Sequence, residues 1–140
     1  MALNSFVTLD DPSASFGTYA YDINKSGEVA GYYVDASGHE NGFVYNNGVY
    51  ITVDDPSATD AVAQTINDLG QIAGYWSTSS SADLGFTDVN GTFTSHIVDP
   101  YPTFMEGSND QGVIVGYYQS GGTDNGFAAY AVNSGAITIL

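Results

Sequence analysis

Carboxylates and aromatic rings recur at matched places along this 140-residue chain. An aspartate precedes a proline three times, at intervals of 44 residues: Asp11, Asp55 and Asp99. A glycine is followed three times by two aromatic residues, and the second members of these pairs are Tyr33, Trp76 and Tyr118. Sugar-binding sites combine carboxylates, which hold hydroxyl groups, with aromatic faces, on which sugar rings stack. These six residues therefore form the predicted ligand site, and carbohydrate is the predicted ligand class.

The same residues also have structural explanations. Aspartate followed by proline favours a turn, because the carboxylate binds nearby backbone N–H groups and proline fixes its own φ angle. Neighbouring residues of a strand point to opposite faces, so one aromatic of each pair must face the core. We expect Tyr32, Tyr75 and Tyr117 on one face. The second members should lie on the other face, partly exposed beside the carboxylates.

Other candidate chemistry is weaker. Residues 22–27 match the first six positions of a calcium-binding EF-hand loop, but Tyr33 stands where that loop needs a bidentate acid. Turn formation explains the same stretch without a metal, so no cofactor is predicted and calcium is kept as an alternative. Asp99 and Glu106 could act in glycoside hydrolysis if their carboxyl groups lay about 5–9 Å apart. No serine-nucleophile, zinc or phosphate-loop motif occurs, so a non-catalytic function is favoured over a glycosidase-like one.

The charge narrows the range of partners. Sixteen acidic residues stand against one basic residue, Lys25, and the formal net charge is −15. Such a chain repels phosphate backbones and anionic lipids, which excludes nucleic acid as a natural partner. No apolar run is long enough to predict membrane insertion, and the first residues lack the segments of a cleaved signal peptide. Composition alone thus predicts a cytoplasmic protein, or one exported without a cleaved leader.

The elements that must position these residues are repeated as well. Three copies of one unit, at approximately 5–48, 49–92 and 93–140, make up a single domain. β-Branched residues and turn signals predict four short strands per copy, near residues 6–10, 18–23, 28–34 and 43–46 in the first copy. An Asn-x-x-Gly element recurs between the second and third strands, and it predicts a tight turn whose glycine has a positive φ.

The repeats predict an all-β domain of three four-stranded units arranged as propeller-like blades, with β-trefoil and β-prism as alternatives. The first strand occurs a fourth time near residues 135–140, so one strand is surplus. Propellers close with about four to eight blades, and an unpaired strand is an open edge that invites another chain. The sequence therefore predicts a homodimer that forms through the terminal strands and weakens as the salt concentration falls.

The motifs resemble the bacterial HAF-type extracellular repeat. The resemblance rests on Leu-Asp-Asp-Pro at 9–12, Asp-Ile-Asn at 22–24, Gly-Tyr-Tyr at 31–33 and Gly-Phe at 42–43, and it covers nearly the whole chain. It implies a secreted or surface-associated bacterial protein with propeller-like blades, and it brings no established activity. The histidine usual before Gly-Phe is replaced in all three copies, by Asn41, Leu84 and Asn125. The favoured function is an extracellular binding or adhesion module, and a purely structural surface repeat is the alternative.

Overall fold

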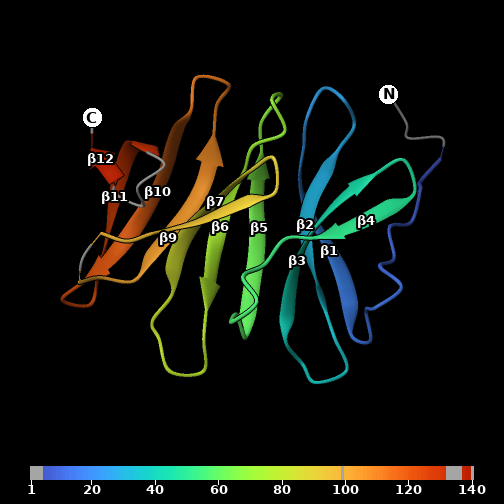
Figure 1. Ribbon diagram of the computed structural model, residues 1–140, viewed down its shortest axis with the longest axis horizontal. Helices are drawn as coiled ribbons and strands as arrows, with labels where there is room; N and C mark the ends of the chain where they lie inside the picture. Colours follow the sequence, from blue (N-terminus) through green and yellow to red (C-terminus); the bar gives the residue numbers. More distant parts are fainter. Residues whose placement is uncertain (1–4, 99, 132–136, 140) are drawn as a thin grey trace.

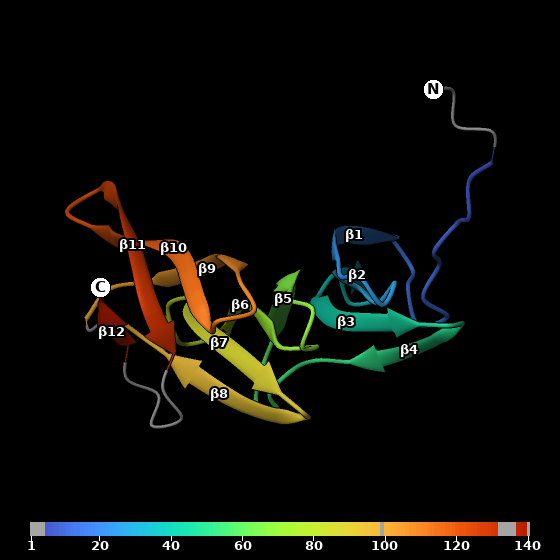
Figure 2. The same ribbon diagram turned by 90° about the horizontal axis from the view of Figure 1, so that it is seen from above.

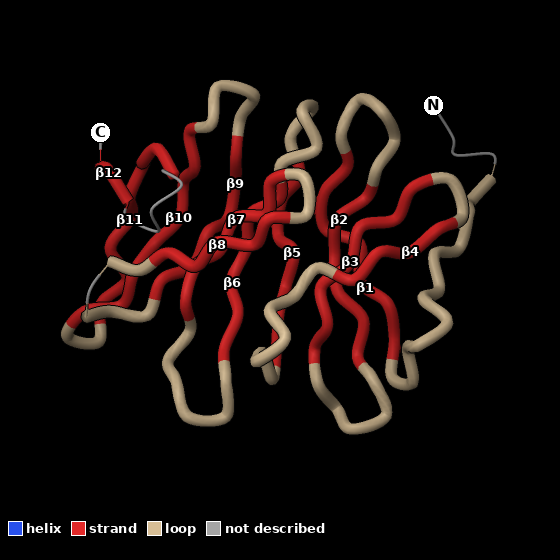
Figure 3. The backbone as a smooth tube through the Cα atoms, in the orientation of Figure 1, coloured by secondary structure: helices blue, strands red, loops and turns tan. Residues whose placement is uncertain are grey.

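The computed structural model describes residues 5–98, 100–131 and 137–139, which form strands and turns (Figures 1 and 3). This part of the chain contains no helix that is long and apolar enough to cross a membrane. The described residues contain twelve strands: β1 (Gly17–Ile23), β2 (Val29–Val34), β3 (Glu40–Asn46), β4 (Val49–Thr52), β5 (Asp60–Ile66), β6 (Ile72–Ser77), β7 (Leu84–Val89), β8 (Thr92–His96), β9 (Thr103–Ser108), β10 (Val113–Ser120), β11 (Thr123–Ala131) and β12 (Ile137–Ile139).

The strands form three antiparallel sheets, each with four strands in sequence order. Sheet 1 contains β1–β4, sheet 2 contains β5–β8 and sheet 3 contains β9–β12. Figure 1 shows the sheets side by side along the long axis, from blue through green to red. The predicted all-β class is thus confirmed. Within the described residues no strand pairs with a strand of another sheet, so the sheets form neither a closed barrel nor a closed ring.

The order of strands within a unit differs from the sequence-based prediction. The segment predicted as the first strand of the second copy forms β4, the last strand of sheet 1, and its counterpart at residues 6–10 is not in a strand. The cause is the two-residue turn at Asn47 and Gly48, whose φ angles of 48° and 91° fold β4 back onto β3. Each sheet therefore begins after an Asp-Pro dipeptide. Since β12 belongs to sheet 3, the surplus copy is the N-terminal one.

The predicted Asn-x-x-Gly turns connect the first two strands of every sheet. Their glycines have φ angles of 81°, 74° and 78°, at Gly27, Gly70 and Gly112. In the first turn, Asn24 Oδ1 accepts hydrogen bonds from the N–H groups of Ser26 (3.1 Å) and Glu28 (3.0 Å). The predicted turn is confirmed, because the asparagine side chain closes it and the glycine supplies the left-handed backbone.

Gly27→Val is expected to lower the free energy of unfolding by about 1–3 kcal/mol, because a β-branched residue is strained at positive φ. Steric crowding is not the cause, since a Cβ built at Gly27 meets no heavy atom within 4 Å. Gly27→Asn is the matched control and should cost much less, because asparagine tolerates this region, as Asn90 does at a φ of 54°. Urea denaturation measures both variants, and equal losses would contradict the strain argument.

The sheets pack face to face along the molecule, as Figure 2 shows from above. The face of sheet 2 or sheet 3 that points toward the preceding sheet is termed its leading face, and the opposite face its trailing face. In sheet 1, the face that packs on sheet 2 is the trailing face and the outer face is the leading face. Ala30 and Val44 on the trailing face of sheet 1 belong to one core with Ile66, Ile72 and Trp76 on the leading face of sheet 2. A second core joins Ala73 of sheet 2 to residues of sheet 3: Met105, Ile114, Phe127 and Ala129. Every inter-sheet core therefore combines one trailing face with one leading face.

Candidate functional site

The second members of the aromatic pairs lie on the leading faces, and the expectation that they are partly exposed is wrong for two of them. Tyr33 is 8% exposed and Trp76 is 7% exposed. Trp76 lies opposite Ala61 across β5 and β6, and its ring packs edge-on against Phe93 at 5.8 Å. Trp76 is buried because sheet 1 and its connection to sheet 2, through Ala30, Val44 and Val53, cover the leading face of sheet 2. Tyr118 is half-buried and stacks on Tyr101 at 5.6 Å.

The aspartates of the Asp-Pro elements stabilise their own turns. Asp11 is buried, and its Oδ1 accepts a hydrogen bond from the Ser13 N–H at 2.8 Å. Asp55 is half-buried, and its Oδ1 accepts the same bond from Ser57 N–H at 2.8 Å. The Ser57 hydroxyl, followed by the Ser57 N–H, lowers the pKa of Asp55 by hydrogen bonding to its carboxylate. Asp99 lies outside the described residues, so the grouping of the three aspartates stays a prediction.

The first members of the aromatic pairs lie on the trailing faces and keep partial exposure: Tyr32, Tyr75 and Tyr117. Tyr32 stacks on Tyr19 with ring centroids 4.7 Å apart. Phe104 lies between the other two, 5.2 Å from the ring of Tyr75 and 4.8 Å from that of Tyr117. Burial, followed by the charge of Glu40, raises the pKa of Tyr75 to about 12. The hydroxyl of Tyr75 therefore stays protonated at neutral pH, and it can donate a hydrogen bond.

A small hollow lies at the boundary between sheets 1 and 2, on the side where β3 and β5 begin. Its volume is about 150 Å³, and its lining includes Glu40, Asp60, Asp83, Tyr75 and Trp76. We term it the acidic hollow. Such a volume is below that of pockets that enclose drug-sized ligands, and it suits one polar group or one edge of a ring.

Hydrogen bonds fix the carboxylate of Asp60 and the backbones of Glu40 and Asp83 at the acidic hollow. Glu40 is the first residue of β3, and its N–H donates to Asp60 Oδ1 at 3.0 Å. The same oxygen lies 3.5 Å from His39 Nδ1. Asp83 precedes β7, and its carbonyl oxygen accepts a hydrogen bond from Thr103 N–H at 3.0 Å. Two of the three acidic residues thus join neighbouring sheets through the backbone.

The electrostatics of the acidic hollow favour a ligand that donates hydrogen bonds or carries positive charge. Burial raises the pKa of Glu40, and the charges of Asp60 and Asp83 raise it further. Burial, followed by the charge of Asp60, also raises the pKa of Asp83. The only lysine of the chain is bonded to Asp68 in a turn at the far end of the strands. The indole Nε1 of Trp76 is buried, and it has no hydrogen-bond partner among the residues that the structure describes.

The remaining candidates from the sequence are placed differently. The carboxylate of Asp22 accepts hydrogen bonds from Thr65 Oγ1 (2.8 Å) and Ile66 N–H (2.9 Å), so it joins sheets 1 and 2. No group of three or more acidic or histidine side chains arranged for a metal occurs among the described residues. Glu106 lies in β9, where burial raises its pKa, whereas its proposed catalytic partner Asp99 is outside the described residues.

Sequence reasoning missed the acidic hollow, although a signal for it exists. An acidic residue stands two positions before the Gly-Phe dipeptide in every copy: Glu40, Asp83 and Asp124. A turn does not require an acid at this place. What the pattern could not show is that Glu40, Asp60 and Asp83 converge from two sheets.

Glu40→Gln is expected to raise the free energy of unfolding at pH 7 and to leave it almost unchanged below about pH 4, the ordinary range of a glutamate. The raised pKa means that the folded state disfavours the charged form, so the wild type loses stability as the pH rises through that pKa. Glutamine removes this loss. Asp124→Asn, at the same repeat position but exposed, is the control. Thermal unfolding at several pH values checks this, and a Glu40→Gln variant that is less stable at pH 7 would contradict it.

Comparisons with known proteins give no relative for this arrangement: no family model, no curated protein and no solved structure matches the chain.

Proposed function

We propose that this chain is a non-catalytic carbohydrate-binding module, and that the acidic hollow holds part of the sugar. The observation that supports this most directly is the meeting of Glu40, Asp60 and Asp83 beside Tyr75 at the boundary of two sheets. Carboxylate oxygens are hydrogen-bond acceptors, and the hydroxyl groups of a sugar are donors that match them.

The acidic hollow also separates sugars by charge. Three acidic side chains repel uronic and sialic acids, and they attract sugars that carry an amine. Neutral and amino sugars are therefore the proposed ligands. The Trp76 Nε1–H could donate to a ring or hydroxyl oxygen that enters the hollow, which would give a buried polar atom its missing partner.

The proposed module has the form of propeller-like blades on the outside of a bacterial cell. Two features support blades: successive sheets pack face to face, and their first strands β1, β5 and β9 contact one another in turn. The resemblance to the HAF-type repeat supports the location. The β-trefoil is disfavoured, because it needs a barrel that the described strands do not form.

Titration calorimetry with a panel of neutral and amino oligosaccharides tests the proposal. Trp76 is the only tryptophan and lines the hollow, so its fluorescence provides a second measurement. Asp83→Asn should weaken binding by at least about tenfold, because it removes a charge-assisted hydrogen bond. The control is Asp54→Asn, which removes the same charge from an exposed position outside the lining of the hollow.

Two outcomes favour the alternatives. Failure of every sugar in the panel to bind would overturn the proposal and favour a purely structural surface repeat. Turnover of chromogenic glycosides would favour the glycosidase-like alternative.

A further inference from the structure

The two outer faces of the stack are open at positions that are covered inside it. Ile23 and Ile66 occupy the same repeat position on the leading faces of sheets 1 and 2, yet Ile23 is 63% exposed and Ile66 is 4% exposed. On the trailing faces, Val115 of sheet 3 is 48% exposed, whereas Ala73 of sheet 2 is 1% exposed. Leu9, Ala20 and Val29 lie in the same groove as Ile23. The leading face of sheet 1 is therefore open around Ile23, although Tyr33 and Phe43 on the same face are buried, and the trailing face of sheet 3 is open at Val115.

Gly126, on the trailing face of sheet 3, indicates what kind of element covers that face. Gly42 and Gly85 lie against the chain that follows their sheets. A Cβ at Gly42 would lie 2.5 Å from the carbonyl oxygen of Val53, in the connection to sheet 2, and 3.4 Å from the Ala63 nitrogen of β5. A Cβ at Gly85 would lie 3.0 Å from Met105 Cε of β9, so that side chain would have to move. Gly126 is the third member of this series, and a Cβ there would meet only the Gly116 oxygen, at 3.9 Å. Nothing in the described chain requires Gly126 to lack a side chain. A further sheet packed as the others are would require it.

Hydrogen bonds join the three Asn-x-x-Gly turns in a row at one end of the strands, and we term this row the turn ladder. Its first and last turns offer complementary hydrogen-bonding groups. Asn24 Nδ2 donates to the Asn67 carbonyl oxygen (3.1 Å), and Asn67 Nδ2 donates to that of Asn109 (3.0 Å). Asn24 and Asn67 are buried, but Asn109 is exposed. The turn ladder thus ends on sheet 3 with the side-chain amide of Asn109, a donor, and it begins on sheet 1 with the carbonyl group of Asn24, an acceptor.

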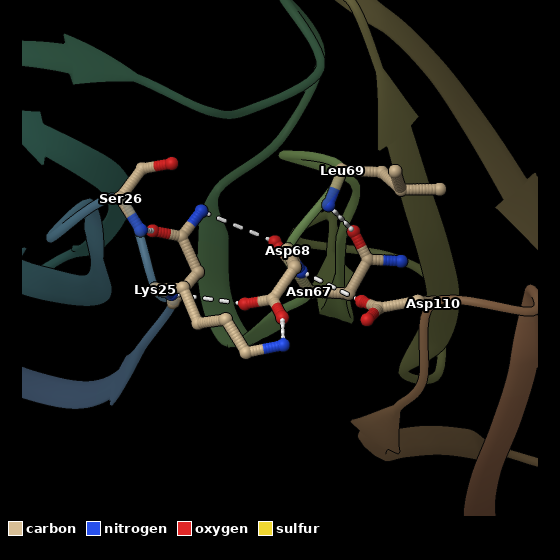
Figure 4. Close-up of polar contacts among 7 residues, drawn as sticks. Lys25, Ser26, Asn67, Asp68, Leu69 and Asp110 are labelled. Atoms are coloured by element: carbon tan, nitrogen blue, oxygen red, sulfur yellow. Dashed lines mark hydrogen bonds and ion pairs between the residues drawn. The ribbon is translucent and has the colours of Figure 1, made fainter.

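The charges along the same ladder also match end to end (Figure 4). The Lys25 N–H donates to Asp68 Oδ1 (2.9 Å), and the Asp68 N–H donates to Asp110 Oδ1 (2.8 Å). Lys25 stands where the other two turns carry an aspartate, and its Nζ is paired with Asp68. An added trailing face would bring another Asp110 beside Lys25, the only lysine of the chain. Lysine offers no acceptor to the Asp110 N–H, so this rung would be an attraction between opposite charges and not a further N–H to Oδ1 bond.

We propose that a second copy of this chain covers both open faces, in a head-to-tail arrangement. The trailing face of sheet 3 of each copy packs on the leading face of sheet 1 of the other, in the manner of the two contacts inside each chain. The twofold pair contains both contacts, so six sheets close into a ring and no apolar face stays open. This inference does not depend on the proposed sugar site.

The N-terminal segment fits the same arrangement. Residues 6–10 come before β1 in the sequence, just as β4 comes before β5. Within the chain, β4 belongs to sheet 1, and sheet 1 packs on the leading face of sheet 2, which contains β5. By this equivalence, residues 6–10 of one copy would approach the fourth-strand side of sheet 3 of the other copy; β12 already fills the fourth position, so we place residues 6–10 beside β12, at its outer edge. Their apolar members Phe6 and Val7 are strongly exposed in the single chain. Contact with that edge would cover them and pair their backbone groups.

Sedimentation and light scattering test the arrangement, with an expected mass of twice 14.7 kDa at moderate salt. Two copies of charge −15 repel each other, so lowering the salt should weaken the dimer. Ile23→Glu and Val115→Glu should each weaken association by at least about tenfold, because each places a charge in an apolar contact. Both side chains are exposed in the single chain, so circular dichroism should show an unchanged fold. Leu69→Glu is the matched control, since Leu69 is also 63% exposed but lies in a turn.

Mixing the variants separates the head-to-tail arrangement from other dimers. Ile23→Glu keeps an intact trailing face and Val115→Glu keeps an intact leading face, so the mixture should form a heterodimer although neither variant associates alone. Gly126→Val should also weaken the dimer without destabilising the single chain. A monomer mass for the wild type, a mixture that fails to associate, or an equal effect of Leu69→Glu would each overturn the proposal.

Discussion

Gly74→Ala is expected to lower the free energy of unfolding by about 3–5 kcal/mol, the range of severe backbone and packing defects. A Cβ at Gly74 would lie 1.9 Å from the Val62 carbonyl oxygen and 3.0 Å from the Gln64 backbone nitrogen. Both are backbone atoms of the neighbouring strand β5, so no side-chain movement relieves the clash. The same contact recurs in the other sheets, at 2.0 Å for both Gly31 and Gly116.

The close approach at Gly74 results from an irregularity in β5. The register between β5 and β6 shifts between Ala63 and Thr65, which is the signature of a β-bulge. A bulge brings one strand unusually near the other, and glycine is the residue that accommodates it. The Gly-Tyr-Trp motif is therefore explained at its first position by the bulge in the strand beside it.

Gly107→Ala is the control for Gly74→Ala. A Cβ at Gly107 meets only Val115 Cγ2, at 3.1 Å, and that side chain is half exposed and able to move. Its cost should stay below about 1 kcal/mol, the size of ordinary surface effects. Denaturant unfolding of the two variants measures the difference. Similar losses at Gly74 and Gly107 would show that strand glycines matter for another reason.

The turns and the all-β class could be predicted from the sequence because both depend on local chemistry. The Asn-x-x-Gly elements gave the positive φ of Gly27 before any tertiary contact was known. The assignment of β4 could not be predicted with the same certainty, because a strand of alternating β-branched residues fits either neighbouring sheet. The turn at Asn47 and Gly48 decides it, because it folds β4 back onto β3.

The faces of the sheets were harder to predict, because tyrosine occurs on both sides of β2. Tyr32 and Tyr33 have the same polarity and size, so the sequence pattern does not indicate which of the two is buried. The burial of Tyr33 depends on which parts of the chain cover the leading face of sheet 1, and this is a tertiary property that the strand pattern does not contain. The acidic hollow had the same difficulty, since Glu40 and Asp60 are brought together by two sheets.

The turn ladder supplies a second large effect: Asn67→Ala is expected to lower the free energy of unfolding by about 2–4 kcal/mol. Asn67 Oδ1 accepts hydrogen bonds from the N–H groups of Leu69 (3.1 Å) and Gln71 (2.9 Å). Asn67 Nδ2 donates to Gln71 Oε1 (2.8 Å) and to the Asn109 carbonyl oxygen (3.0 Å). The side chain is 5% exposed, so alanine leaves several buried groups unpaired, at about 1–3 kcal/mol for each one that water cannot reach.

Asn109→Ala is the matched variant, because it removes the same turn bonds from an exposed side chain. Asn109 Oδ1 accepts from the N–H groups of Gln111 and Val113, each at 3.0 Å. Water can replace these bonds, so the expected cost is about 0.5–1.5 kcal/mol, that of ordinary hydrogen bonds. Denaturant unfolding at low protein concentration compares the single chains. The excess cost at Asn67 measures the link between sheets 2 and 3, and equal costs would mean that the turn alone, and not the ladder, stabilises the stack.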